Sequence, residues 1–413
     1  MRGTLLFLVF MAIAWPASAQ SLDCTATRYQ QPIFSSIEVA RNVVYGQNTT
    51  MGGEQKTLRM DVYEPAGDAL AQRPLIVFAH GGAFVSGDRF DMSWFAYRFA
   101  RLGYVTATID YRLIDIAITD STQLFEGALR ASHDMRAAVR YFREDAATDD
   151  RFGIHPDYIY AGGVSAGGVM SLHLAHFDAS DAVPEHIQAI LDNLGGFEGD
   201  TSDNTHYASN VRGAMNYAGS LIRAEWVDAA SAPFYSAHDD ADPIVPYGYG
   251  TTDAFSFPAF SYGSAAVKQA ADAAGVPNQL FTVRNSRNHL SFLFSRDSTA
   301  VFSGTINFMR NLTCPTSTSV EADRPDSRPD VTVYPNPAAH SVTVRGASSA
   351  PYDVAVYNVV GQQLYRATWQ QGEVRIAVAD WPAGTYFIEW RSVASNSGQS
   401  DGERHVAPLV IAR

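Results

Sequence analysis

Apolar residues follow two patterns, one in the longer first part of the chain and one in its shorter last part. In the first part, continuous apolar runs of strand length alternate with stretches of helical spacing. Strands are expected at 74–79, 104–109, 158–161, 211–217, 233–237 and 279–283, and helices at 133–143, 166–175 and 264–274. Continuous apolar runs are typical of strands buried on both faces. Their alternation with helices predicts an α/β fold with a mostly parallel sheet and helices on both faces.

The last part carries only short strand-like runs separated by turn residues. These runs lie at 331–334, 341–344, 354–357, 374–378 and 386–390. Such spacing predicts a small all-β sandwich over residues 331–413. Residues 315–330 before it are polar, rich in proline and without apolar periodicity, so we interpret them as a linker. The main domain is then expected to cover residues 20–314.

The first residues have the pattern of an export signal. Arg2 is followed by an apolar run at 5–15, too short to span a bilayer, and then by Ala17-Ser18-Ala19. This order predicts a signal peptide over residues 1–19 that is removed before Gln20. No other run approaches the length of a transmembrane segment.

Composition and charge narrow the function classes. Of the 413 residues 46% are hydrophobic, which is enough for a substantial core and argues against global disorder. The net charge is -13, and residues 331–413 contribute six acidic residues and six arginines, so the whole excess lies in residues 1–330. An acidic surface repels phosphate backbones, so no nucleic-acid partner is expected.

The two cysteines, Cys24 and Cys314, bracket the first part of the chain. On an oxidising export route such a pair is more readily bridged than free, so we predict a disulfide, with two free thiols as the alternative. Closing so long a loop could stabilise the fold by roughly 4–5 kcal/mol in the chain-entropy model. Two cysteines cannot build a zinc site by themselves.

The segment Gly163-Val164-Ser165-Ala166-Gly167 lies between an expected strand and an expected helix. This context is required for a nucleophile elbow, in which Ser165 is exposed on a sharp turn and glycines make room for it. The N-terminus of the helix would face developing negative charge. A glycine-rich turn that only packs is the alternative.

A second glycine-rich segment, His80-Gly81-Gly82-Ala83-Phe84, follows an earlier buried strand. In acyl transfer the carbonyl oxygen becomes an oxyanion that needs preplaced N–H donors. Gly82 and Ala83 could donate from this loop and Ala166 from the elbow. A plain tight turn is the alternative.

An acidic segment and a late histidine could complete a catalytic triad. Within 238–243, Asp242 is the chosen acid, while Asp239 and Asp240 are expected to be solvated turn residues; a calcium-binding loop is the alternative. His289 follows the last expected strand and could act as general base. The order Ser165, Asp242, His289 is that of an α/β-hydrolase.

These motifs identify a family resemblance. Residues 55–312 resemble the α/β-hydrolase superfamily, and within it the hormone-sensitive-lipase type of carboxylesterase and related bacterial carbohydrate esterases. The resemblance rests on 80–83, Asp110-Tyr111-Arg112, 163–168, Asp242 with Val245-Pro246, and His289. Ala83 stands where many relatives have glycine, and Asp239 stands where the family often has glycine after the histidine.

The sequence predicts the residues of the substrate pocket less well than those of the triad. Phe84, Leu221 and Trp226 are candidate substrate-binding residues, with core packing as the alternative. Residues 178–210 form a polar, glycine-rich insertion that is expected to be a cap or a mobile loop.

The last part has its own resemblance. Residues 333–337, 356–361 and 382–386 are similar to the C-terminal sorting domain of type IX secretion substrates. That resemblance implies passage across an outer membrane, with the secretion machinery as partner. An adhesive or carbohydrate-binding sandwich is the alternative.

Together these features predict a secreted serine esterase that acts through an acyl-enzyme, without metal or cofactor. Acylated polysaccharides or short-chain esters are the expected substrates, with lipids and polyesters as alternatives. A serine peptidase could use the same triad order, but the loop at 80–83 argues against it. A non-catalytic adhesion protein would normally have lost a triad member.

Overall fold

The computed structural model describes residues 22–25, 27–251, 255–315, 331–335, 338–346, 352–358, 363–369, 373–392 and 404–411. The predicted signal peptide and the predicted linker from residue 316 onward lie outside these ranges. The chain divides into two units, residues 1–316 and 317–413, and each is described by itself.

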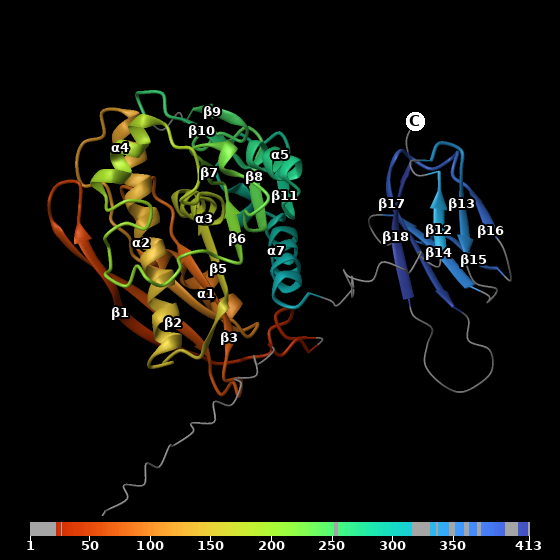
Figure 1. Cartoon of the computed structure of the whole chain (residues 1–413), viewed down its shortest axis with the longest axis horizontal. Coiled ribbons are helices and arrows are strands. Elements are labelled where there is room, and N and C mark those ends of the chain that lie inside the picture. The colour runs from red at the N-terminus through yellow and green to blue at the C-terminus, as the bar shows by residue number, and fades with distance from the viewer. Residues whose placement is uncertain are drawn as a thin grey trace, which may run out of the picture. The chain divides into compact units, whose positions relative to one another are not determined.

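The first unit is built on an eight-stranded sheet with the order β1-β2-β4-β3-β5-β6-β8-β11 (Figure 1). Its strands are β1 (Ile37–Thr49), β2 (Gln55–Pro65), β3 (Arg73–Ala79), β4 (Val105–Ile109), β5 (Ile154–Val164), β6 (Gly213–Tyr217), β8 (Phe234–Asp239) and β11 (Asn278–Val283). The strands from β4 to β11 pair in parallel, whereas β1 and β2 are antiparallel additions at one edge. The predicted α/β fold is confirmed.

Helices and a small second sheet surround this central sheet. The helices are α1 (Ser93–Ala100), α2 (Ser121–Ala147), α3 (Ala166–His176), α4 (Glu185–Asn193), α5 (Ser264–Ala274), α6 (Ser291–Phe294) and α7 (Ser298–Thr313), with the 3₁₀ turns η1 (Arg89–Met92) and η2 (Ala224–Trp226). The small sheet joins β7 (Ser220–Leu221), β10 (Phe260–Gly263) and β9 (Tyr249–Thr251). No helix in the described ranges is long and apolar enough to cross a membrane.

Side chains along β3 alternate between two apolar cores, one on each face of the central sheet. Leu75, Val77 and Ala79 belong to the core that α2 and α3 cover. Ile76 and Phe78 belong to the core that α1 and α7 cover. All seven residues of β3 are buried, which explains why this strand appears in the sequence as a continuous apolar run.

A disulfide joins Cys24 to Cys314, with the two Cα atoms 5.5 Å apart. The predicted bridge is confirmed, and it closes a separation of 290 residues. Cys314 follows directly on α7, so the bridge ties the start of the first unit to its last helix.

The second unit consists of two antiparallel sheets, as predicted for a small all-β domain. One has the order β12-β13-β16 and the other β15-β14-β17-β18. The strands are β12 (Val331–Tyr334), β13 (Ser341–Gly346), β14 (Tyr352–Asn358), β15 (Gln363–Trp369), β16 (Glu373–Ala377), β17 (Gly384–Ser392) and β18 (Arg404–Ile411). Both sheets contribute to one apolar core that includes Val342, Val356 and Ile388.

Candidate active site

The three predicted triad residues meet at one edge of the central sheet. Ser165 follows β5, Asp242 lies just past β8, and His289 lies in the loop after β11. Because these strands run in parallel, their carboxyl ends share one edge, where the loops of open α/β sheets form binding crevices.

The backbone at Ser165 is held in a conformation that few side chains adopt. Its φ is 55° and its ψ is -115°, and its N–H donates to the carbonyl of Tyr217 at 2.7 Å. A Cβ on Gly163 would lie 2.2 Å from the backbone of Gly167, and a Cβ on Gly167 would lie 2.0 Å from the carbonyl oxygen of Ala79. The turn therefore requires glycine at both positions.

A hydrogen-bond chain links the three side chains. The Nε2 atom of His289 lies 2.9 Å from Oγ of Ser165, and its Nδ1 atom lies 2.6 Å from Oδ2 of Asp242. The Asp242 side chain is fully buried, whereas the imidazole of His289 is 19% exposed.

The surroundings of Asp242 favour its charged form. Its Oδ1 atom accepts the N–H groups of Ile244 and Val245 at 2.8 and 3.1 Å, and Nε2 of His238 lies 3.4 Å from Oδ2. Burial alone would raise the pKa of Asp242, but the bonds from His238 and His289 outweigh it and hold this pKa well below its usual range. The carboxylate is therefore charged at neutral pH.

The glycine-rich loop after β3 lies beside Ser165. Ala83 has a φ of 54°, and both Ala83 and Ala166 line a cavity together with Ser165. In the described part of the chain, the N–H groups of Gly82, Ala83 and Ala166 have no main-chain acceptor. A Cβ on Gly82 would lie 2.1 Å from the carbonyl oxygen of Ser86, so the loop could not close over a larger residue.

The segment 110–112 supports the glycine-rich loop that follows β3. The hydroxyl of Tyr111 donates to the carbonyl of His80 at 3.1 Å, and the two rings stack with centroids 4.2 Å apart. Burial lowers the pKa of His80, so this ring is neutral at neutral pH and packs as an aromatic group.

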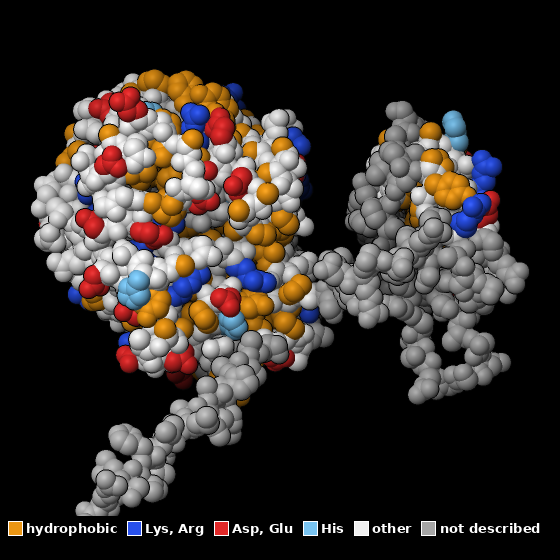
Figure 2. Space-filling view, in the orientation of Figure 1, with side chains coloured by type: hydrophobic (Ala, Val, Ile, Leu, Met, Phe, Trp, Pro, Cys, Tyr) orange, Lys and Arg blue, Asp and Glu red, His pale blue; other side chains and the backbone are white. Residues whose placement is uncertain are grey.

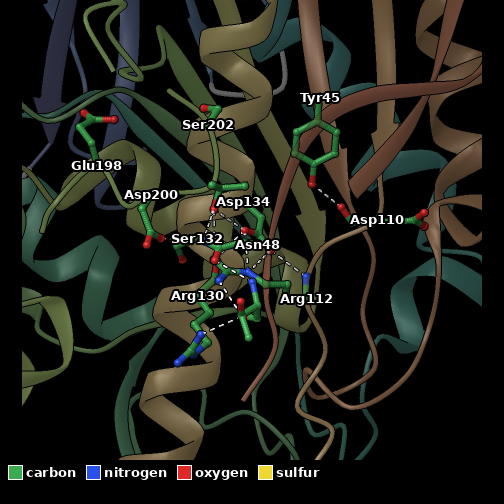
Figure 3. A network of polar contacts seen from close by, with 12 residues as sticks. Tyr45, Asn48, Asp110, Arg112, Arg130, Ser132, Asp134, Glu198, Asp200 and Ser202 are labelled. Atoms are coloured by element: carbon green, nitrogen blue, oxygen red, sulfur yellow. Dashed lines mark hydrogen bonds and ion pairs between the residues drawn. The ribbon is translucent and has the colours of Figure 1, made fainter. Parts of the chain in front are cut away.

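A buried ion pair fixes the next residue of that segment (Figure 3). The Arg112 guanidinium and the Asp134 carboxylate are 2.8 Å apart, and their side chains are 1% and 0% exposed. Thr201, from the 178–210 insertion, donates its hydroxyl to Asp134 and accepts a hydrogen bond from Arg112. The insertion also binds α2 through the ion pair of Arg140 with Glu198. These bonds pin the second half of the insertion to the body of the domain.

A cavity of about 90 Å³ opens beside Ser165. Its walls are mostly apolar and come from the glycine-rich loop after β3, α2, the start of α3, β7 with the residue after it, and residues 244–261. The lining residues are Ala83, Phe84, Leu124, Phe125, Ala128, Ser165, Ala166, Val169, Ser220, Ile222, Ile244, Val245, Pro246, Phe255, Ala259 and Ser261. The cavity wall does not include the 178–210 insertion, so within the described ranges nothing supports its assignment as a cap.

Of the three predicted substrate-binding residues, the structure brings only Phe84 to this cavity. Leu221 is fully buried in the core, because side chains alternate along the chain and it is Ser220 and Ile222 that face the cavity. Trp226 stacks on Phe177 with ring centroids 4.1 Å apart and is 2% exposed. The core-packing alternative describes these two residues.

The expectation that Asp239 and Asp240 are solvated turn residues is wrong for Asp239. Its side chain is buried and accepts hydrogen bonds from the N–H and the hydroxyl of Ser291. Asp240 is half-buried and accepts the N–H groups of Asn285 and Ser286 at 3.0 and 3.1 Å. Each carboxylate therefore binds the loop that carries His289, a role that sequence reasoning missed because the partners are more than 40 residues away.

The side chains of the same segment do not form a metal site. Among the described residues, no group of three or more histidine, cysteine, aspartate or glutamate side chains is arranged to hold a metal ion. The three carboxylates of 239–242 are directed at different groups, which gives the calcium-loop alternative no support.

Acidic and basic side chains are interspersed over the face of the first unit that Figure 2 shows. No broad basic surface appears on that face.

Comparison with known proteins gives two family matches. The BD-FAE esterase family matches residues 60–252, and the secretion system C-terminal sorting domain matches residues 332–399. The esterase LipC of Mycobacterium tuberculosis is 27% identical over 196 residues, which are 46% of this chain and 42% of that protein. A probable isoprenylcysteine alpha-carbonyl methylesterase of Oryza sativa is 32% identical over 120 residues, 27% of this chain and 26% of that protein. The chain thus spans less than half the length of these curated relatives.

Solved structures of esterases are also similar to this chain. A truncated carbohydrate esterase from gut microbiota has a TM-score of 0.48 and 18% identity, covering 68% of this chain and 98% of that one. Native esterase 2 of Thermogutta terrifontis has a TM-score of 0.45 and 21% identity, covering 69% and 94%. On these family matches the predicted resemblances are confirmed: residues 60–252 are similar to the BD-FAE family, and residues 332–399 are similar to the secretion system C-terminal sorting domain.

Proposed function

We propose that this protein is a secreted esterase that cleaves carboxylic esters with Ser165 as nucleophile. The observation that carries the proposal is the unbroken chain from Oγ of Ser165 through His289 to the buried Asp242. Such a chain activates a weak nucleophile by placing a base on its proton and a carboxylate on the other side of the base.

The reaction follows from the positions of these atoms. Oγ of Ser165 bonds to the ester carbonyl carbon while its proton passes to Nε2 of His289. The tetrahedral intermediate then collapses, the bond to the alcohol oxygen breaks, and that oxygen takes the proton back from His289. Water repeats the sequence on the acyl-serine, with His289 as base, and releases the acid and free Ser165.

The charge that develops on the carbonyl oxygen would be met by main-chain N–H groups. Ala83 and Ala166 line the cavity beside Ser165, and Gly82 directly precedes Ala83 in the same loop. Ala166 is the first residue of α3, whose first N–H groups lack intrahelical acceptors. The free N–H of Ala166 and the axis of α3 both favour negative charge there.

The cavity supports a small acyl group. At about 90 Å³ it is well below the roughly 300–1,000 Å³ of pockets for drug-sized ligands, and its walls are mainly apolar. We therefore favour short-chain esters, including those carried by an acylated polysaccharide, over long-chain lipids.

The C-terminal domain supports export. Its match indicates secretion or display at the cell surface, and we propose that the secretion machinery is its partner. A chain ending near Ser319 retains Cys314 and all the proposed catalytic residues, so it should keep near-normal esterase activity while failing to leave a host with type IX secretion. Unchanged export would remove the sorting role, and loss of activity in a folded protein would assign the domain a part in the active site.

The proposed activity is tested on the purified protein with chromogenic acetyl, butyryl, feruloyl and long-chain esters and with a peptide substrate. Turnover should be highest on the short esters. Ser165→Ala should reduce kcat by about 10³-fold or more without changing the Tm. Substantial activity of this variant would exclude Ser165 as nucleophile, and hydrolysis of the peptide alone would favour a peptidase.

A further inference from the structure

The loop between β11 and α6 carries His289 in a strained stretch of backbone. Asn285 has a φ of 57° and Leu290, the residue directly after His289, has a φ of 64°. Residues other than glycine adopt this left-handed region only where the surroundings hold them there. The position of the imidazole between Ser165 and Asp242 therefore depends on what fixes the loop on either side of it.

Two carboxylates at the end of β8 fix this loop. Asp240 accepts the N–H groups of Asn285 and Ser286, on the side before His289. Asp239 accepts the N–H of Ser291 at 3.0 Å and also its hydroxyl, on the side after the strained Leu290. The loop is thus attached to β8 at both of its ends.

Asp239 is the more constrained of the two carboxylates. It is the last residue of β8, its register partner in β11 is Val283, and it is 0% exposed. A buried carboxylate needs its hydrogen-bond partners, so Ser291 cannot leave it without cost. We propose that Asp239 is a positioning residue: through Ser291 it holds His289 in line with Ser165. This rests on the proposed function of Ser165 and His289.

The proposal predicts that geometry, rather than charge, is the contribution of Asp239. In Asp239→Asn the amide oxygen can still accept the N–H of Ser291, and the amide nitrogen can donate to its hydroxyl. In Asp239→Ala both contacts are lost. We expect Asp239→Ala to lower kcat by about 10- to 100-fold with little change in KM, because a small misplacement of a catalytic group costs this much. Asp239→Asn should recover most of the loss.

A matched control comes from Asp145 near the end of α2. It is also buried, and its carboxylate accepts the N–H groups of Arg151 and Phe152 at 3.3 and 3.2 Å. At 1.5 Å per residue it lies about 30 Å along α2 from Leu124, which lines the cavity. Asp145→Ala should therefore lower the Tm, as Asp239→Ala does, and leave kcat unchanged.

The experiment combines three measurements on the full mature chain and these variants. The first is kcat and KM on a short chromogenic ester, with Tm alongside. The second is the rate at which a fluorophosphonate probe modifies Ser165, followed by mass spectrometry. The third is hydrogen exchange in peptides covering residues 285–294. Asp239→Ala should slow turnover and labelling and speed the exchange of this segment. Adding Ser291→Ala to it should reduce kcat no further, since both changes break one contact.

The outcomes separate the positioning role from the proposed function. If Asp239→Ala keeps kcat within twofold of the parent, if Asp145→Ala loses as much, or if Asp239→Asn recovers nothing, the positioning role is overturned. If the parent protein neither hydrolyses esters nor reacts with the probe, the proposed function is wrong. Faster exchange at 285–294 in Asp239→Ala alone would even then show that Asp239 holds the loop.

Discussion

The turn at Ser165 and the loop at His289 bring two partner side chains within 2.9 Å of each other by different physical means. The turn is shaped by close packing, since Gly163 and Gly167 leave no room for a Cβ. The loop is shaped by charge, since the carboxylates of Asp239, Asp240 and Asp242 each bind a different part of it. One half of the site is therefore fixed by sterics and the other by hydrogen bonds to anions.

This difference decides what a mutation can do. A steric constraint tolerates no added atom and does not depend on pH. A hydrogen-bonded carboxylate tolerates some replacements and weakens when it is protonated.

The largest effect is expected for Asp242→Asn. An amide at this position can present an N–H group, rather than an acceptor oxygen, to Nδ1 of His289. It also carries no negative charge, so it cannot stabilise the imidazolium. We expect kcat to fall by roughly 10³- to 10⁴-fold, as for loss of the acid in other triads. Steady-state kinetics on a short ester would measure it, and a loss below tenfold would mean that Asp242 is not the triad acid.

A substitution in the turn at Ser165, the half of the site that is fixed by sterics, should first lower the stability of the fold. A Cβ on Gly167 would lie 2.0 Å from the carbonyl oxygen of Ala79, so Gly167→Ala forces α3 away from β3. We expect a loss of about 2–3 kcal/mol in the free energy of unfolding. The control is Gly248→Ala, since no heavy atom lies within 4 Å of a Cβ there. Equal urea-unfolding curves for the two variants would contradict the steric account.

These two halves also differ in how far the sequence reveals them. The glycines of the turn lie within two residues of Ser165, so a five-residue motif marks the turn, although the atom that a Cβ on Gly167 would meet belongs to Ala79 on β3. The contact of Asp239 with Ser291 spans 52 residues, and no local pattern marks it. An aspartate among turn residues resembles a solvated one until β8 and β11 are seen side by side.

The burial pattern of each segment explains which other sequence predictions were right and which were wrong. The fully buried strands, such as β3, were predicted because their apolar runs are continuous. β1 was not, because only two of its thirteen residues are buried and its register contains bulges. Leu221 was chosen as a pocket residue for its size, but alternation along the chain sends its neighbours Ser220 and Ile222 to the cavity instead. The sequence therefore predicted that a short segment is buried, but not which of its side chains point into the cavity.

Low pH should change the stability contributed by the loop at His289 but not the stability contributed by the turn at Ser165. The folded state holds the pKa of Asp242 below its usual value of about 3.9, so the unfolded chain binds more protons at low pH. The stability that Asp242 contributes is therefore fully present above about pH 5 and is lost as the pH falls through 4 toward the folded pKa. Unfolding measured from pH 7 to pH 3 should show the gap between the parent and Asp242→Asn shrinking.

The penalty of Gly167→Ala serves as the reference for this titration. Because it arises from overlap of atoms, it should stay constant over the same pH range. A penalty for Gly167→Ala that changed with pH as much as that for Asp242→Asn would show that the two halves are not physically distinct.

The smallest effect is expected for Asp240→Asn. Asp240 is half-buried, and its two acceptor contacts go to main-chain N–H groups rather than to a catalytic side chain. The amide retains one acceptor oxygen, and water can reach the N–H group that loses its partner. One such hydrogen bond contributes about 0.5–1.5 kcal/mol, so kcat should fall by no more than about tenfold. Kinetics of Asp242→Asn and Asp240→Asn measured side by side would decide between the two acids: if Asp240→Asn were the more damaging, the charge that orients His289 would have to be assigned to Asp240.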